Sequence, residues 1–192
     1  MTAPRPVAGA SPFRPVGEEL IYEGYVIRVL SGEFEGPDGK RFKRDIVRHP
    51  GAVAVVPVED GPDGDHVFLV RQYRATIDTD LWEIPAGKRD VADEPPHVTA
   101  HRELAEEVGR QAGAMDLLIN VYHSPGFCDE YGWIYLATDL IEVPQALEGE
   151  EEQFMEVARV PAAEAVAMAL DGRITDAKSI AGILAAARKR GW

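Results

Sequence analysis

The pattern of hydrophobic and polar positions predicts a group of strands near the N-terminus. Three segments rich in apolar and β-branched side chains favour extended structure: residues 20–22, 25–30 and 41–47. The sequences GEF at 32–34 and PDGK at 37–40 contain residues that turns require, so we expect turns there. Residues 18–48 are therefore predicted to form a small antiparallel sheet that precedes the main domain.

Residues 49–192 show the pattern of a layered domain of strands and helices. Residues 52–58 form a continuous apolar run, which is typical of a strand buried on both faces. Four further segments are predicted to be strands: 66–73, 117–122, 132–137 and 154–160. Two helices are expected near the C-terminus; the first ends at Gly172, and Thr175 or Asp176 caps the second. Strands that alternate with helices in this way favour the α/β class.

The composition is that of a folded domain without a basic surface. The 192 residues are 45% hydrophobic and 28% charged, and the formal net charge is −13. This charge argues against a nucleic-acid partner, which requires clustered lysine and arginine. No apolar run is long enough to span a membrane, and the proline-rich residues 1–17 are expected to be a flexible leader. The single Cys128 excludes an internal disulfide, so a cytoplasmic location is expected.

Three glutamates are crowded into one predicted helix. Glu103 and Glu107 are four residues apart and Glu106 directly precedes Glu107, so the three carboxylates lie close together on the helix surface. Like charges at this spacing destabilise a helix unless something compensates for them. Two interpretations stay open on these residues alone. The cluster is either a solvated acidic face or a site for a hard divalent cation, which prefers carboxylate oxygens.

The residues around these glutamates resemble the Nudix box. The matching positions are Gly87, Glu94, Arg102, Glu103, Leu104, Glu106, Glu107 and Gly109. The match departs from the family pattern in two places. Six residues rather than five separate Gly87 from Glu94, and Arg110 replaces an aliphatic residue. The resemblance implies that residues 49–192 form a Nudix-type α/β/α sandwich with a mixed sheet, preceded by the small N-terminal antiparallel sheet.

The resemblance also implies a metal site and a hydrolytic reaction. In the family, glutamates of the box helix and a backbone carbonyl of the preceding loop hold divalent cations. By position, these ligands are Glu103, Glu106, Glu107 and the carbonyl of Ala86. Mg²⁺ is the expected cofactor, with Mn²⁺ able to substitute for it. A bound cation of this kind neutralises phosphate charge and activates water, which suits hydrolysis of a diphosphate bond.

A general base is expected outside the box, because the box glutamates are occupied with metal. The run Glu150-Glu151-Glu152 is a second acidic cluster, and by itself it would be read as a solubilising loop. Resemblance to related Nudix enzymes points to Glu151 as the catalytic base. Gln153 stands where a second acid is common in such enzymes, so Glu150 and Glu152 stay open as alternatives.

Motifs outside the box resemble the ADP-ribose pyrophosphatase branch of the family: RQYR at 71–74, LWEIPAG at 81–87 and SPG at 124–126. This resemblance implies Mg²⁺-dependent hydrolysis of ADP-ribose to AMP and ribose 5-phosphate. Two alternatives stay open. One is a broader hydrolase of nucleoside diphosphate sugars, and the other is a Nudix domain that senses a nucleotide without cleaving it. The retained box glutamates favour an enzyme.

The same resemblance implies contacts with a small-molecule substrate. Arg74 would contact phosphate or ribose, since a guanidinium can donate two parallel hydrogen bonds. Ser124, Pro125 and Gly126 would line the pocket for the terminal ribose, and Glu130 would bind ribose hydroxyls or assist the metal site.

The N-terminal sheet has an implied role in assembly and in binding adenine. In the ADP-ribose pyrophosphatase branch, two subunits exchange such sheets, so the resemblance implies a homodimer with residues 18–48 as its dimerisation element. Whether the sheets are exchanged in this chain stays open. Tyr25 would stack on the purine and Arg44 would close over it.

Overall fold

The computed structural model describes residues 11–147 and 152–192, and the chain divides into two compact units. The first unit contains the residues up to Gly51 together with the segment Tyr122–Tyr131. The second unit contains Ala52–Val121 and Gly132–Trp192. The hydrophobic pattern does not indicate that the loop after residue 121 belongs with the N-terminal strands.

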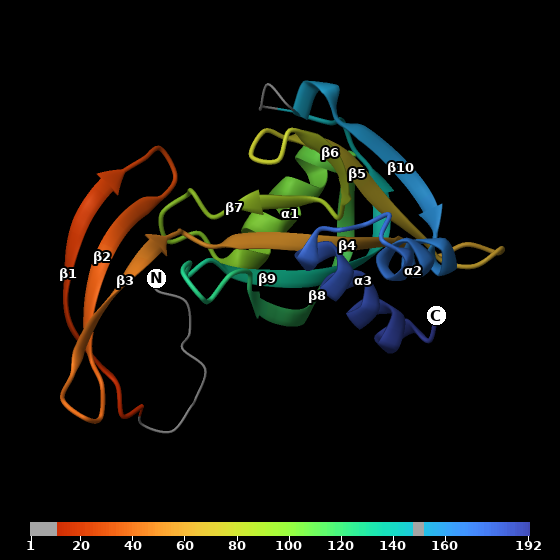
Figure 1. Ribbon diagram of the computed structural model, residues 1–192. Helices are drawn as coiled ribbons and strands as arrows, with labels where there is room; N and C mark the ends of the chain where they lie inside the picture. Colours follow the sequence, from red (N-terminus) through yellow and green to blue (C-terminus); the bar gives the residue numbers. More distant parts are fainter. Residues whose placement is uncertain (1–10, 148–151) are drawn as a thin grey trace. The chain divides into compact units, whose positions relative to one another are not determined.

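The first unit is built on a three-stranded antiparallel sheet in the order β1-β2-β3 (Figure 1), which confirms the predicted N-terminal sheet. Its strands are β1 (Arg14–Glu23), β2 (Arg28–Glu35) and β3 (Arg41–Arg48). β1 begins inside residues 1–17, which were predicted to be a leader. Arg14 pairs in register with Glu35, and its guanidinium lies 2.7 Å from the Glu35 carboxylate. This pairing extends the sheet beyond its predicted start at residue 18.

One of the two predicted turns is confirmed. The backbone N–H of Gly36 donates to the carbonyl of Lys40 at 2.9 Å, which closes the turn at PDGK. The turn predicted at GEF is wrong, because Gly32 to Phe34 lie inside β2 and pair with β3. Gly32 provides space rather than a turn, since a β-carbon at this position would collide with the side chain of Ile46.

The second unit contains a seven-stranded mixed sheet in the order β10-β5-β4-β9-β8, with β6 paired to β5 and β7 paired to β4. Its strands are β4 (Ala52–Glu59), β5 (His66–Arg74), β6 (Thr79–Glu83), β7 (Ala86–Lys88), β8 (Arg110–Tyr122), β9 (Tyr131–Glu142) and β10 (Glu156–Pro161). β9 runs parallel to β4, whereas β5 and β7 run antiparallel to it. The short strands β6 and β7 were not predicted from the sequence.

Helices cover both faces of this sheet, as Figure 1 shows for α1 (Pro96–Val108) on one side and α2 (Ala162–Asp171) and α3 (Ala177–Arg190) on the other. The alternation along β4 explains the arrangement, because successive side chains of a strand point to opposite faces. Val55 belongs to the buried cluster under α1 that includes Leu104. Its neighbour Val56 belongs to the cluster under α2 and α3 that includes Ile183. The predicted α/β/α sandwich is confirmed.

The residues at the ends of α1 and α3 suit the start or the end of a helix. Pro95 is the N-cap of α1 and another proline follows it, which suits a helix start where backbone N–H groups lack partners. Gly109 ends α1 in the left-handed region with φ of 65°. The carboxylate of Asp176 caps α3 by accepting the backbone N–H of Ser179 at 2.9 Å.

Within residues 11–147 and 152–192, no helix is long and apolar enough to cross a membrane.

Candidate active site

Two box glutamates lie on the buried side of α1. Glu107 is 3% exposed and Glu103 is 9% exposed, as their four-residue spacing on one helical face requires. Glu106 is half-buried, and its carboxylate lies 2.9 Å from the guanidinium of Arg102. Arg102 also lies 3.0 Å from the carboxylate of Glu103 and 3.8 Å from that of Glu94. One arginine therefore holds the loop before α1 and two helix carboxylates together.

Strand β7 faces these glutamates at close range. The backbone N–H of Ala86 donates to Oε2 of Glu107 at 3.0 Å, which fixes that carboxylate against the strand. Gly87 is the next residue, and a β-carbon there would overlap the carboxylate of Glu103. Glycine is therefore required at position 87, because any side chain would displace the carboxylate of Glu103.

The two buried carboxylates repel each other and are separated from water. Burial, together with the charge of Glu103, raises the pKa of Glu107 to about 8. Burial also raises the pKa of Glu103 to about 7, although Arg102 acts in the opposite direction. The charge of Glu152 contributes to both shifts. Such a cluster fits a hard divalent cation, which would stabilise both ionised carboxylates.

The carboxylates of Glu103 and Glu107 would suit a cation that takes its remaining ligands from water and substrate. Among the described residues, no three His, Cys, Asp or Glu side chains converge as a complete set of ligands. Mg²⁺ in particular is commonly bound by one or two carboxylates and completes its shell with water and substrate phosphates. Glu103, Glu107 and the nearby backbone of Ala86 are therefore consistent with the metal site that the resemblance implied.

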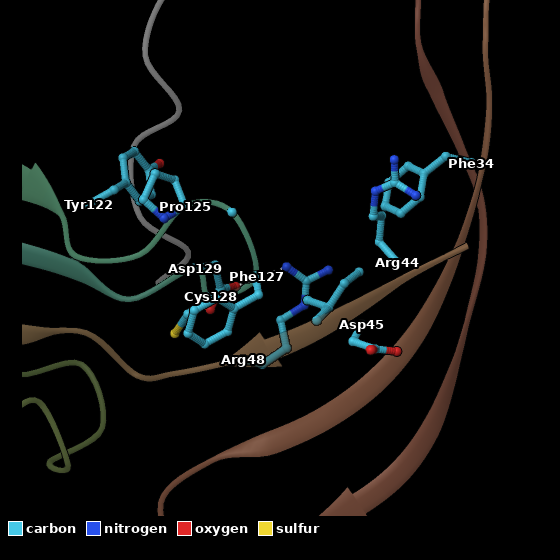
Figure 2. A pocket seen from close by; sticks show the side chains of 11 residues that line it. Phe34, Arg44, Asp45, Arg48, Tyr122, Pro125, Phe127, Cys128 and Asp129 are labelled. Carbon is cyan, nitrogen blue, oxygen red and sulfur yellow. Dashed lines mark hydrogen bonds and ion pairs between the residues drawn. The ribbon is translucent and has the colours of Figure 1, made fainter. Parts of the chain in front are cut away.

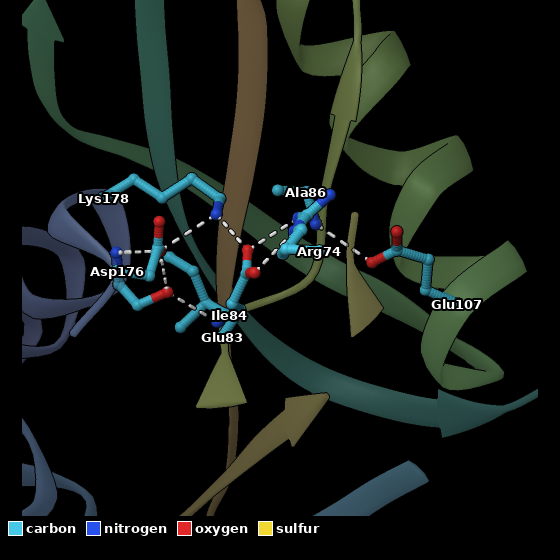
Figure 3. Close-up of polar contacts among 8 residues, drawn as sticks. Arg74, Glu83, Ile84, Ala86, Glu107, Asp176 and Lys178 are labelled. Atoms are coloured by element: carbon cyan, nitrogen blue, oxygen red, sulfur yellow. Dashed lines mark hydrogen bonds and ion pairs between the residues drawn. The ribbon is translucent and has the colours of Figure 1, made fainter. Parts of the chain in front are cut away.

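Arg74, at the end of β5, is fixed by a buried glutamate (Figure 3). Its Nε and Nη2 donate to Oε1 and Oε2 of Glu83, both at 2.7 Å. Burial alone would raise the pKa of Glu83, but the Arg74 hydrogen bond and the charge of Lys178 hold it below its ordinary value. The Glu83 hydrogen bond raises the pKa of Arg74, and Glu107 contributes to this shift. Both groups are therefore charged.

Sequence reasoning missed the partners of Arg74. Lys178 of α3 forms a close ion pair with Glu83 and lies 2.9 Å from Asp176 (Figure 3). Nothing in the sequence links Glu83 to Lys178, because they are 95 residues apart. The available signal is the acidic residue within the otherwise apolar segment LWEI, since a glutamate in a buried strand needs charged partners.

The first unit contains a pocket of about 410 Å³, lined by residues from β2 and β3 and from the segment Tyr122–Tyr131 (Figure 2). Three of the predicted substrate residues line it: Arg44, Pro125 and Gly126. Arg48 and Phe127 also line it, and neither was predicted from the sequence. The pocket combines apolar surface with guanidinium groups, so it suits a flat polar ligand.

The loop that forms one wall of this pocket is firmly tied to β3. The N–H of Val47 donates to the carbonyl of Phe127 at 2.7 Å, and the N–H of Asp129 donates back to Val47 at 3.1 Å. The carboxylate of Asp129 also accepts from Arg48 and from the backbone N–H of His49, both at 2.9 Å. These contacts hold the SPG motif in a defined place.

The remaining predicted residues do not line this pocket. Tyr25 is fully exposed in the turn between β1 and β2. Ser124 supplies its backbone carbonyl to the N–H of Cys128 at 2.8 Å. The carboxylate of Glu130 lies 3.8 Å from Nδ1 of His49.

Of the three glutamates considered for the catalytic base, only Glu152 is among the described residues. Glu150 and Glu151 lie outside the described residues. Glu152 begins a short 3₁₀ helix (Glu152–Phe154) and is half-buried. Its electrostatic effect on both buried box glutamates indicates that Glu152 itself lies near them.

The α/β/α sandwich, with helix carboxylates buried against a glycine-bearing strand, agrees with the Nudix resemblance of the sequence. A family model described as the NUDIX domain matches residues 48–182, and the chain belongs to this family of pyrophosphohydrolases. The chain is 41% identical to the ADP-ribose pyrophosphatase of Mycobacterium tuberculosis (strain ATCC 25618 / H37Rv), over 90% of this chain and 82% of the relative.

A second relative and one solved structure are also similar to this chain. The ADP-ribose pyrophosphatase of Bacillus subtilis (strain 168) is 38% identical over 86% of this chain and 88% of its own length. A crystal structure of an ADP compounds hydrolase superposes with a TM-score of 0.78 and 24% identity, covering 96% of this chain and 98% of that one. The latter similarity supports the fold.

Proposed function

We propose that this protein hydrolyses the diphosphate bond of ADP-ribose to AMP and ribose 5-phosphate, with Mg²⁺ as its cofactor. The observation that carries the proposal is the pair of buried carboxylates, Glu103 and Glu107, held against Ala86 and Gly87. The two relatives named ADP-ribose pyrophosphatase support the choice of substrate. Mn²⁺ is expected to substitute for Mg²⁺, because both prefer oxygen ligands.

In this proposal, Glu103, Glu107, Glu106 and the carbonyl of Ala86 hold the cation. When bound, the cation neutralises diphosphate charge and lowers the pKa of an attacking water. Arg74 binds the diphosphate through N–H groups that Glu83 does not use. Together these groups orient the diphosphate and stabilise the charge that develops on it.

Glu151 is proposed as the base that accepts the proton of the attacking water. Support comes from its neighbour Glu152, whose charge raises the pKa of both Glu103 and Glu107. The carboxylate of Glu152, one residue from Glu151 in the chain, is therefore near the cluster. Replacing Glu150, Glu151 and Glu152 singly with glutamine should produce the largest loss in kcat at Glu151. An equal or larger loss at one of the other two would move the role there.

The pocket of the first unit is proposed to bind a ribose or nucleoside part of the substrate. Its volume of about 410 Å³ is within the usual range for small-molecule pockets. Arg44, Pro125 and Gly126 line it, whereas Ser124 supports the same loop through its backbone. The roles of Tyr25 in stacking on adenine and of Glu130 in binding ribose hydroxyls stay predictions.

We further propose that the protein is a homodimer that associates through β1. All ten residues of this strand are exposed, and they include Leu20, Ile21 and Tyr22. An edge strand with exposed apolar side chains is suited to pairing with or packing against another chain. Light scattering should show a dimer for the wild type and a monomer for Ile21→Glu. A wild-type monomer at micromolar concentration would contradict this assignment. The cytoplasmic location stays a prediction.

A substrate panel tests the proposed reaction. Purified protein with Mg²⁺ should cleave ADP-ribose with a higher kcat/KM than NADH, GDP-mannose, coenzyme A or diadenosine polyphosphates. A clear preference for GDP-mannose would support the broader nucleoside diphosphate sugar hydrolase instead. Binding of ADP-ribose without turnover on any substrate would support the nucleotide-sensing alternative.

A further inference from the structure

The contact between Arg74 and Glu83 leaves one edge of the guanidinium available. Arginine has five N–H donors in a planar fork, and Glu83 engages only Nε and Nη2. The side chain of Glu83 is 2% exposed, whereas that of Arg74 is 37% exposed. One edge of the guanidinium is therefore held by a buried carboxylate, and the other edge can donate to a ligand.

Lys178 holds the same carboxylate from a different element. Its ammonium group, on the first turn of α3, forms a close ion pair with Oε2 of Glu83, and its side chain is 11% exposed. The ammonium group also lies 2.9 Å from Oδ2 of Asp176, the N-cap of that helix. Charges therefore alternate from Arg74 through Glu83 and Lys178 to Asp176 (Figure 3). The oxygens of Glu83 are thus fixed from α3 while they grip Arg74.

Stability alone does not explain such a buried chain of charges. Removing charged groups from water is costly, and well-packed apolar residues of similar size often stabilise a core as well or better. What the charges provide is orientation, because a bidentate carboxylate fixes both the position and the plane of a guanidinium. A group that must grip a diphosphate in the transition state needs that kind of fixation.

We propose that Glu83 and Lys178 are positioning residues for diphosphate hydrolysis, and that they act by holding Arg74 with its free edge towards the substrate. The helix α3, far from the box in sequence, thus completes the diphosphate subsite. The inference rests on the proposed function only in requiring a diphosphate substrate. It applies to whichever nucleoside diphosphate derivative the wild type cleaves best.

A double-mutant cycle on Arg74 and Lys178 tests this inference. Lys178→Met, Arg74→Ala and the double variant are compared with the wild type on its best diphosphate substrate. Lys178→Met should lower kcat/KM by about tenfold or more, because the arginine loses its fixed orientation. In the Arg74→Ala background, the same substitution should change kcat/KM by less than about twofold, because its effect passes through Arg74. Equal losses in both backgrounds, or no loss in either, would overturn the proposal.

Two further variants separate positioning from folding. Lys189→Met is a matched control at the other end of α3, since Lys189 pairs with Asp116 at 2.8 Å in a solvent-exposed position. It should leave kcat/KM unchanged. If Lys178→Met unfolds, the combination Asp176→Asn with Lys178→Met removes one charge of each sign, and asparagine still caps the helix. That folded variant should show the same loss, and wild-type activity in it would overturn the proposal.

A binding measurement distinguishes failure of this inference from failure of the proposed function. The methylene analogue of the diphosphate substrate is titrated into each variant with Mg²⁺ by calorimetry. Lys178→Met and Arg74→Ala should both weaken binding, and the double variant should bind no more weakly than Arg74→Ala. If the wild type cleaves a diphosphate other than ADP-ribose, the proposed substrate is wrong while the cycle still decides the role of Lys178.

Discussion

Replacing Glu107 with glutamine should stabilise the metal-free protein while it impairs catalysis. Glu107 is 3% exposed, and burial together with Glu103 raises its pKa to about 8 from the ordinary 4.5. A carboxyl with a raised folded-state pKa binds its proton more tightly when folded. The folded state therefore loses stability as the pH rises from the unfolded pKa towards about 8.

The size of the effect follows from the same shift. At pH 7, the ionisable carboxyl of Glu107 destabilises the fold by about 3 kcal/mol, and at pH 5 by less than about 1 kcal/mol. Glutamine carries no charge, and its carbonyl oxygen can still accept the N–H of Ala86. Glu107→Gln should therefore raise the free energy of unfolding in EDTA, with a larger gain at pH 7 than at pH 5.

Urea unfolding monitored by tryptophan fluorescence measures this gain. Glu142→Gln is the control, because the Glu142 side chain is 84% exposed and lies 3.9 Å from its nearest cation. The control should show no pH-dependent gain. With Mg²⁺ present, Glu107→Gln should lose at least about tenfold in kcat/KM, since it removes a proposed cation ligand. No gain in EDTA, or an equal gain at both pH values, would refute the argument that burial disfavours ionisation of Glu107 when no metal is bound.

Three other predictions follow from contacts in the second unit. Gly87→Ala should displace the carboxylate of Glu103 and lower kcat/KM by about tenfold or more; wild-type kinetics would show that the close approach is unimportant. Ser179→Ala removes a buried hydroxyl that accepts a backbone N–H at 2.8 Å, and it should reduce the free energy of unfolding by about 1–3 kcal/mol in a urea titration. Trp192→Phe removes the indole N–H that donates to Asp65 at 2.8 Å, and it should lower the free energy of unfolding by about 1 kcal/mol. An unchanged urea midpoint would contradict either stability prediction.

The sequence contains enough information for the layers of the fold and for the box. The continuous apolar run at 52–58 predicts β4 because a strand covered on both faces needs apolar side chains at every position. Glu103, Glu106 and Glu107 are found because one helix carries them at a short spacing within a stretch that resembles the Nudix box. A sequence pattern therefore predicts a structural element well when the residues that define the element are close together in the sequence.

The parts that could not be predicted depend on contacts between distant residues. Gly32 suggests a turn, but it is glycine because Ile46 of β3 occupies the space of a side chain. The fixation of Arg74 requires Glu83 from β6 and Lys178 from α3, and their spacing in the chain carries no signal. The segment Tyr122–Tyr131 joins the first unit through backbone hydrogen bonds with Val47, which residue type does not encode.

The alternation along β4 divides its side chains between two buried clusters, one on each face of the sheet. Val55 and Val56 are adjacent residues, yet Val55 packs beneath the helix of the box and Val56 packs beneath the C-terminal helices. A change in side-chain volume at Val55 alters the packing beneath α1, whereas a change at Val56 alters the packing beneath α2 and α3. The helix that carries the box and the C-terminal helices therefore pack against the same strand through two separate sets of side chains.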